Sequence, residues 1–149
     1  MSKSDDLPFT LTLHVRDTCL CMHVRRAARA IARRYDEALR PVGLTNGQFS
    51  LLMSLNRPGA ASMTDIADLL AMDRTTLTAN LKPLERRGLV EVSVAPKDKR
   101  SRRLTLTEAG RDVLRQATPI WHKAQVENEA LLVEDTDADG VRAALRALS

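Results

Sequence analysis

The chain has 149 residues, 44% hydrophobic and 28% charged, so it can bury one core, and its composition excludes disordered and fibrous proteins. Aromatic residues make up only 3%, which means that the core must be aliphatic. The formal net charge is +4, and the excess lies in residues 73–103, which carry nine Lys or Arg against four Asp or Glu. A local basic patch attracts polyanions, nucleic acid first and an acidic membrane second; a solubilising surface is the alternative.

Nothing in the sequence indicates a membrane or secreted protein. No run approaches the ~18–20 consecutive apolar residues that span a bilayer, and residues 1–13 lack a signal-peptide pattern. Cys19 and Cys21 stand one residue apart within a helical pattern, which is no disulfide framework and suits a reducing compartment. We therefore expect a cytoplasmic protein without a membrane partner.

Apolar residues that recur every three or four positions from Thr12 to Leu39 predict one long amphipathic helix, which Pro41 and Gly43 end. Arginines at 25, 26, 29, 33 and 34 form a basic face on it, which we interpret as a solvated surface or as ion pairs with residues 36 and 37 rather than as a DNA contact. A second helix begins at Thr45, which with Gln48 has the pattern of a capping box.

Two short helices with a tight join follow. Ser62 and Thr64 are alternative N-caps of the first helix. Asp73 can cap the second helix, which runs toward Arg87 and ends at Gly88. Such a pair is a helix-turn-helix.

Beyond Gly88 the apolar period changes to two, and alternating residues at 90–94 and 103–106 predict a β-hairpin joined by the polar, basic connection 95–102. A hairpin after the second helix of a helix-turn-helix is a wing. Thr107 then caps a long helix that reaches about Val133 with a bend at Pro119, and a last helix covers residues 138–148.

The predicted fold is mainly α with a small β-hairpin wing, in one domain. A winged helix-turn-helix lobe at 43–107 lies between an N-terminal dimerisation helix at 1–42 and C-terminal dimerisation helices at 108–149. The terminal amphipathic helices need burial beyond the small winged core, which predicts a homodimer.

A helical wheel places Leu77, Leu81 and Leu84 inward, so the opposite face of their helix would meet DNA. The residues near its start suit base edges, and those further back suit phosphates. The expected contacts on this helix are Arg74, Thr75, Thr76, Thr78, Lys82 and Arg86. Pro83 removes a helical hydrogen bond and predicts a kink that would re-aim Lys82 and Arg86.

The wing connection is long enough to reach a neighbouring minor groove. Arg100 suits the negative potential of narrow A·T-rich stretches, with Lys97 and Arg102 beside it. An acid near DNA is costly unless it is paired, so we predict that Asp98 braces the side chain of Arg100.

Four segments together resemble the signature of the MarR family of regulators: residues 73–78, 84–90, 98–100 and 106–110. The resemblance implies a triangular dimer that binds a pseudo-palindromic duplex with Arg100 in the minor groove. It also implies that the dimer represses transcription and dissociates from the DNA when a small effector or an oxidant binds. Ala79 departs from the family pattern, because many members carry a basic residue there.

Cys21 stands fourteen residues before Tyr35, a placement similar to the reactive cysteine and its tyrosine partner in the organic-hydroperoxide branch of the family, although Asn46 replaces a second tyrosine of that branch. A small buried cysteine is the simpler interpretation. Cys19 and His23 alone are too few for a metal site. Trp121 and His122 would line a ligand cavity or belong to the dimer core.

Neither a cofactor nor an enzymatic activity is expected, because the chain lacks a serine elbow, a phosphate loop and a metal-spaced cluster. The sequence therefore predicts a DNA-binding transcription regulator. Oxidant sensing through Cys21 and a winged helix used only for protein contacts are the alternatives.

Overall fold

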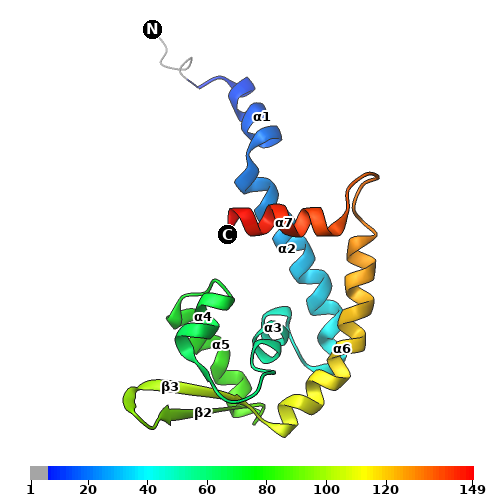
Figure 1. The fold of residues 1–149 in the computed structure, drawn as a ribbon. Helices are drawn as coiled ribbons and strands as arrows, with labels where there is room; N and C mark the ends of the chain where they lie inside the picture. Colours follow the sequence, from blue (N-terminus) through cyan, green and yellow to red (C-terminus); the bar gives the residue numbers. More distant parts are fainter. Residues whose placement is uncertain (1–6) are drawn as a thin grey trace. The chain divides into compact units, whose positions relative to one another are not determined.

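The computed structural model describes residues 7–149 (Figure 1). The first six residues, on which the expected lack of a signal peptide partly depends, lie outside the described part. The elements are α1 (Phe9–Thr18), α2 (Leu20–Leu39), η1 (Arg40–Val42), α3 (Asn46–Ser54), β1 (Ala61–Ser62), α4 (Met63–Leu69), α5 (Arg74–Arg86), β2 (Val90–Ala95), β3 (Asp98–Leu106), α6 (Glu108–Glu129) and α7 (Ala138–Leu148). The mainly helical fold with a wing is confirmed. No helix among the described residues is both long and apolar enough to cross a membrane.

The chain divides into two compact units, the first ending at Arg34 and the second running from Tyr35 to Ser149. The first contains α1 and most of α2, and here the prediction of one continuous helix is wrong. Cys19 has an extended conformation, with φ −67° and ψ 107°, and ends α1. The Thr18 hydroxyl donates to the His14 carbonyl at 2.7 Å, a local bond that competes with helix continuation. The apolar period continues across the break, so periodicity alone missed it.

The second unit begins with the end of α2 and the start of α3. The capping box is confirmed: the Gln48 amide donates to Thr45 Oγ1 at 3.2 Å, and the Thr45 amide donates to Gln48 Oε1 at 3.1 Å. Asp36, which one of the two interpretations of the basic face paired with arginines of its own helix, accepts from the backbone and side-chain amides of Asn46 at 2.7 and 2.8 Å. Asp36 and Asn46 thus fasten α3 to α2.

The helix-turn-helix consists of α4 and α5. Of the two alternative caps, Ser62 is the one used, and its Oγ accepts from the Asp65 amide at 3.0 Å. The turn between the helices contains Ala71 in a left-handed conformation, with φ 49°. The inner face of α4, formed by Met63, Ile66 and Ala67, is buried. The predicted tight join is therefore a real turn that packs both helices on one core.

The wing is part of a three-stranded antiparallel sheet with the order β1-β3-β2. The predicted hairpin is present, with Val92 opposite Leu104, and the strands are longer than expected because β3 begins at Asp98. The sequence analysis missed β1, which pairs Ala61 with Leu104 and Ser62 with Arg103. This short strand ties the wing to the start of α4.

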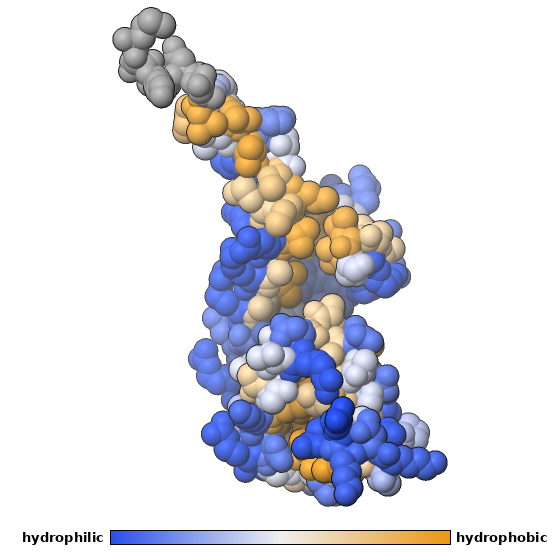
Figure 2. Space-filling view, turned by 90° about the vertical axis from the view of Figure 1, so that its left-hand side faces the viewer, coloured by the Kyte–Doolittle hydropathy of each residue, from blue (hydrophilic) through white to orange (hydrophobic). Residues whose placement is uncertain are grey.

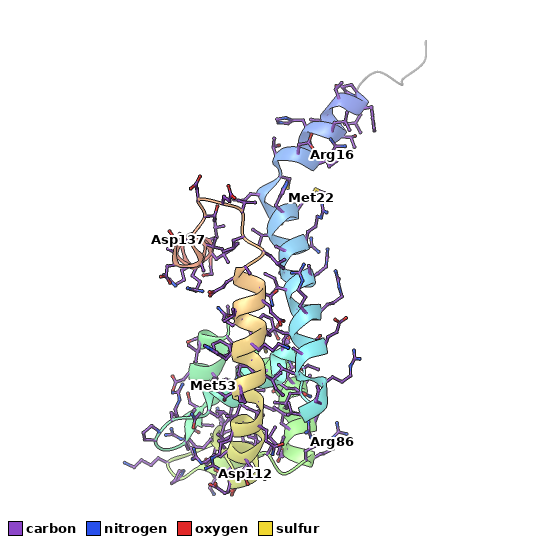
Figure 3. All side chains as sticks on the ribbon, turned by 90° about the vertical axis from the view of Figure 1, so that its right-hand side faces the viewer. Arg16, Met22, Met53, Arg86, Asp112 and Asp137 are labelled. Carbon is purple, nitrogen blue, oxygen red and sulfur yellow. The ribbon has the colours of Figure 1, made fainter. Side chains whose placement is uncertain are left out.

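The core is aliphatic, as the composition predicts. The largest fully buried side chains belong to Leu39, Leu51, Leu52, Leu55, Ile66, Leu77, Leu84 and Leu104. They come from α2, α3 and its C-cap Leu55, α4, α5 and β3, so one core holds the helix-turn-helix and the wing together. Met53 of α3 lines the same space as Thr118 and Trp121 of α6, and Asp137, labelled in Figure 3, is the N-cap of α7. Helix α6 ends at Glu129, four residues before the predicted Val133.

Candidate nucleic-acid interface

Helix α5 begins at a complete N-cap. Asp73 accepts from the Thr76 amide and from the Thr76 hydroxyl, both at 2.8 Å. These hydrogen bonds, the backbone one first, hold the pKa of the Asp73 carboxyl below its ordinary value. The cap fixes the first turn of α5, which is the turn expected to reach base edges.

The predicted outward face of α5 is exposed, while Leu77, Leu81 and Leu84 are at most 4% exposed. Its exposed residues include all of the expected DNA contacts of this helix: Arg74, Thr75, Thr76, Thr78, Lys82 and Arg86. Two of the three hydroxyl protons are already used inside the helix, because Thr76 donates to Asp73 and Thr78 donates to the Arg74 carbonyl at 2.8 Å. Thr76 and Thr78 therefore present oxygen acceptors.

Pro83 does not end α5, which continues to Arg86. The Leu89 amide donates to the Leu84 carbonyl at 3.0 Å beyond the helix end, and Gly88 there has a left-handed φ of 71°. Lys82 and Arg86 stay on the exposed face on either side of the proline, and Figure 3 shows Arg86 at the edge of the molecule. Both side chains remain available for phosphates.

The prediction that Asp98 braces the side chain of Arg100 is wrong. The Asp98 carboxylate accepts from the backbone amide of Arg100 at 3.0 Å and from the hydroxyl of Ser101 at 2.9 Å, rather than from a guanidinium. The short aspartate side chain reaches an amide two residues ahead, as in an Asx turn. These bonds lower the pKa of Asp98. Asp98 thus shapes the backbone at Arg100 and leaves that side chain exposed.

The other wing residues, Lys97, Arg100 and Arg102, are exposed as expected. The register of the sheet shifts between Val94 and Ala95, so the backbone around Arg100 is irregular. Arg103 is a further exposed cation, and its pairing with Ser62 places it next to the N-terminus of α4. The sequence contained no signal for this pairing, because β1 is two residues long.

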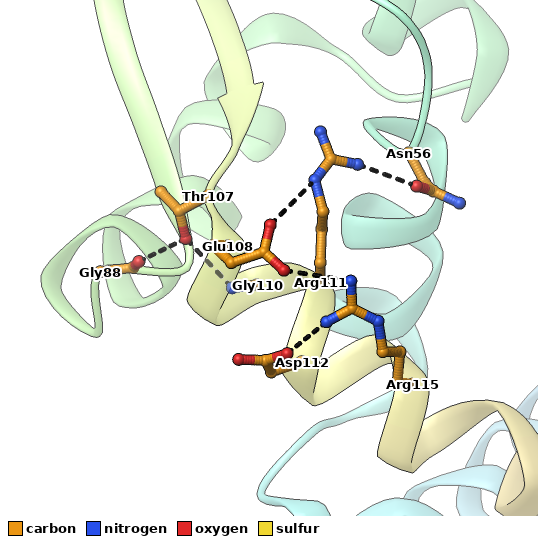
Figure 4. Close-up of polar contacts among 8 residues, drawn as sticks. All are labelled: Asn56, Gly88, Thr107, Glu108, Gly110, Arg111, Asp112 and Arg115. Atoms are coloured by element: carbon orange, nitrogen blue, oxygen red, sulfur yellow. Dashed lines mark hydrogen bonds and ion pairs between the residues drawn. The ribbon is translucent and has the colours of Figure 1, made fainter.

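Helix α6 is fixed to the end of α5 (Figure 4). The Thr107 hydroxyl donates to the Gly88 carbonyl at 2.6 Å and accepts from the Gly110 amide at 3.0 Å. A side chain at Gly110 would collide with the carbonyl oxygen of Leu89 and with Leu106 Cδ1. Glu108 pairs with Arg115, and Arg111 donates to Asn56 at 3.2 Å. The start of α6 is therefore joined directly to the turn that follows α5.

An apolar cavity of about 520 Å³ lies between α3, the end of α4 and α6. Phe49 and Trp121 stack in it, with ring centroids 6.1 Å apart. The lining residues are Phe49, Ser50, Met53, Ser54, Leu69, Leu70, Thr118 and Trp121. A smaller cavity of about 150 Å³ shares Phe49, Ser50 and Trp121 and adds Tyr35, Leu39 and Asn46. Trp121 thus lines both cavities, whereas His122 is exposed and lines neither.

Cys21 and Tyr35 lie in different units and have different surroundings. Cys21 is exposed on α2, so its interpretation as a small buried cysteine is wrong, and Cys19 is half-buried in the break before α2. Tyr35 donates its hydroxyl to Gln125 Oε1 at 2.5 Å. His23 Nδ1 lies 2.8 Å from the Cys19 carbonyl oxygen, and residues 7–149 contain no group of three side chains suited to a metal ion. The role of Cys21 in oxidant sensing stays a prediction.

Known proteins share this architecture. The family model described as "MarR family" matches residues 44–101. The crystal structure of the M. tuberculosis transcriptional regulator MosR in complex with DNA is similar to the chain at 41% identity and a TM-score of 0.79, covering 87% of this chain and 92% of that one. The chain belongs to the MarR family.

Curated MarR-type relatives are more distant and longer. The transcriptional activatory protein BadR of Rhodopseudomonas palustris is 34% identical over 63% of this chain and 55% of its own length. The transcriptional repressor MprA of Escherichia coli K12 is 29% identical over 81% of this chain and 66% of its own length. The chain therefore spans between about half and two thirds of these two relatives.

The MarR signature segments now have physical roles. Asp73 caps α5, Gly88 supplies the left-handed residue after it, and Gly110 allows α6 to approach Leu89. Ala79, which departs from the family pattern, is exposed on the outward face of α5. Its methyl group carries no charge, so Arg74, Lys82 and Arg86 supply the positive charge of this face.

Proposed function

We propose that the chain is a sequence-specific DNA-binding transcription regulator that reads a pseudo-palindromic duplex as a homodimer. The observation that carries the proposal is that one compact unit presents an exposed polar face on α5 together with exposed arginines on the wing. Arg74 and the threonines of the first turns would read base edges in the major groove, and Lys82 and Arg86 would bind phosphates. Arg100 would enter the minor groove.

A second copy of the chain is the proposed occupant of the apolar surfaces on the terminal helices. No residue of α1 or α7 is buried. Phe9 is 71% exposed on α1 and Leu148 is 59% exposed on α7, and Figure 2 shows apolar side chains gathered on α1. Exposed apolar surface of this extent favours association. A dimer would place two copies of α5 in successive major grooves.

We also propose that the regulator is a cytoplasmic repressor released by a small molecule. The cavity of about 520 Å³ supports this proposal, since ligand sites typically measure ~300–1,000 Å³ and combine apolar walls with a few polar groups. Here Phe49 and Trp121 form an aromatic wall, and Ser50 and Thr118 supply hydroxyls. The cavity touches α3, α4 and α6, so a ligand there would contact the elements that position α5.

The test is selection of bound duplexes from a random pool with the purified full-length protein. We expect a palindromic motif with half-sites about one helical turn apart. Binding to the selected duplex should weaken steeply with salt, with a log–log slope of about −0.9 per phosphate contacted. No enrichment at low salt, or a slope near zero, would overturn the proposal and favour a winged helix that binds proteins.

A further inference from the structure

Three hydrogen bonds run in series from the end of α2 across α6 to α7. The Tyr35 hydroxyl donates to Gln125 Oε1 at 2.5 Å, Gln125 Nε2 donates to Glu129 Oε1 at 2.6 Å, and Arg142 Nη1 donates to the same Glu129 oxygen at 2.7 Å. A glutamine amide accepts only at oxygen and donates only from nitrogen. A donor at Tyr35 and an acceptor at Glu129 therefore fix Gln125 in a single orientation.

The first end of this series lies at a cavity. Tyr35 lines the space of about 150 Å³ and shares it with Phe49, Ser50 and Trp121, which also line the larger cavity. Burial, and after it the negative charge of Glu129, raises the pKa of Tyr35. The hydroxyl is thus protonated at neutral pH and acts as a donor, either to Gln125 or to an acceptor that enters the cavity.

The other end lies on α7. Because α7 has no buried residue, it is not held by a packed core of its own. Arg142 joins it to α6 through Glu129, and the second nitrogen of the same guanidinium binds Asp139 at 2.7 Å within α7. The side chains of Arg142 and Glu129 are 44% and 38% exposed, so solvent screens the pair and its hold on α7 is weak.

We propose that Tyr35, Gln125, Glu129 and Arg142 form a relay through which the contents of the smaller cavity control the position of α7. A ligand with a hydrogen-bond acceptor takes the Tyr35 hydroxyl, and Gln125 then loses the donor that fixes its orientation. Glu129 in turn loses the amide hydrogen bond that holds its carboxylate in place beside Arg142, so the link to α7 is less well fixed. The inference rests on the proposed function, since it extends the effector site from the larger cavity into the smaller one that shares Phe49, Ser50 and Trp121 with it, and takes α7 as a dimer contact.

The relay predicts that a change at Tyr35 alters amide hydrogen exchange in α7, about a hundred residues later in the chain. In full-length protein at neutral pH, Tyr35→Phe keeps the ring and removes the donor. We expect amide hydrogen exchange in residues 138–148 to become about threefold faster or more. A threefold change is near the lower end of the effects measured for side chains in one hydrogen-bond network. Arg142→Gln weakens the bond between α7 and Glu129 directly, so we expect it to give the fastest exchange in α7. The double variant should exchange no faster than Arg142→Gln.

Glu127→Gln is the matched control for Glu129→Gln. Both substitutions neutralise a carboxylate on α6, two residues apart, but within residues 7–149 the partner of Glu127 is Lys123, in an exposed pair at 3.7 Å. Exchange in α7 should rise in Glu129→Gln and stay at the wild-type rate in Glu127→Gln. Equal rates in these two variants, or an unchanged rate in Tyr35→Phe, would overturn the relay.

Two small probes separate the relay from the effector cavity. Benzyl alcohol and ethylbenzene have nearly the same shape, and only the alcohol has an oxygen that can accept from Tyr35. Trp121, the one tryptophan of the sequence, reports occupancy through its fluorescence. We expect both probes to change that fluorescence and only benzyl alcohol to speed exchange in α7.

An equal effect of both probes on α7 would contradict the relay, because packing alone would then explain the coupling. If neither probe changes the fluorescence of Trp121, the effector cavity of the proposed function fails, while the variants still decide whether the relay exists. Exchange in α7 is measured without DNA, so a failure to select duplexes would leave this test intact.

Discussion

The hydroxyl of Thr107 lies 2.6 Å from the carbonyl oxygen of Gly88, nineteen residues earlier in the chain. One atom of Thr107 therefore both caps α6 and closes the end of α5. The Thr107 amide adds a bond to the Leu89 carbonyl at 3.1 Å. These bonds join the two ends of the wing, because Gly88 and Leu89 precede its first strand and Thr107 follows its last strand.

Thr107→Val keeps the shape of the side chain and removes both hydroxyl bonds. We expect the free energy of unfolding to fall by about 1–2 kcal/mol, the usual cost of losing an N-cap with a further hydrogen bond. Urea denaturation at neutral pH measures it. Thr136→Val, at an exposed loop position, is the control and should change stability by less than ~0.5 kcal/mol.

Gly110→Ala should destabilise the protein by about 1–3 kcal/mol, because the added methyl collides with the Leu89 carbonyl and with Leu106. Gly47→Ala is the matched control in α3, where a Cβ meets nothing within 4 Å. There alanine should raise stability by roughly 0.5–1 kcal/mol, since it reduces backbone freedom in the unfolded chain. The same sign for both variants in thermal unfolding would contradict the close approach of α6.

The lowered pKa of Asp73 predicts a pH-dependent contribution to stability. A carboxyl whose folded pKa lies below its ordinary 3.8 stabilises the fold above that value and loses this contribution as pH falls through the folded pKa. Asp73→Asn keeps a capping oxygen without the charge. The stability advantage of the wild type over Asp73→Asn should be constant from pH 7 to about 5 and decrease as the pH falls below the ordinary value and through the folded pKa. An advantage that does not change with pH would exclude the charge of Asp73 as its source.

Measurements of DNA affinity should distinguish a cation in the minor groove, Arg100, from one that binds phosphate, Lys82. Arg100→Ala should weaken binding most at duplexes with A·T-rich flanks, because the narrow minor groove is where its charge matters. Lys82→Ala should weaken all sequences about equally and reduce the salt slope by about one. Fluorescence anisotropy on two duplexes with different flanks measures both effects, with Lys123→Ala on α6 as the control. Equal losses at both flanks for Arg100→Ala would refute the minor-groove assignment.

Local chemistry explains which features the sequence predicted. The caps at Thr45 and Asp73 need a polar side chain and an amide three residues away, so they are visible in a short window. The inward leucines of α5 follow the helical period. The same periodic patterns predicted which residues of α5 and the wing face outward, and these residues are exposed in the structure.

The missed features depend on partners distant in sequence or on backbone geometry. Strand β1 exists because Ala61 meets Leu104, and Tyr35 finds Gln125 ninety residues away. Asp98 was assigned to a guanidinium by charge, whereas the turn brings a backbone amide within its reach. The break at Cys19 lies inside an uninterrupted apolar period, which masks a change in backbone conformation.

Strand β3 pairs with β2 on one side, but on the other side β1 covers it only at Arg103 and Leu104. The stretch from Asp98 to Arg102 therefore forms an open sheet edge, and its side chains are almost all charged. Charged residues on such an edge prevent a second sheet from adding to it. The cations proposed to bind DNA thus also form a charged edge of the kind that disfavours pairing with another chain. A variant meant to abolish DNA binding should carry glutamate at these positions, since valine or leucine would expose an edge that recruits other chains.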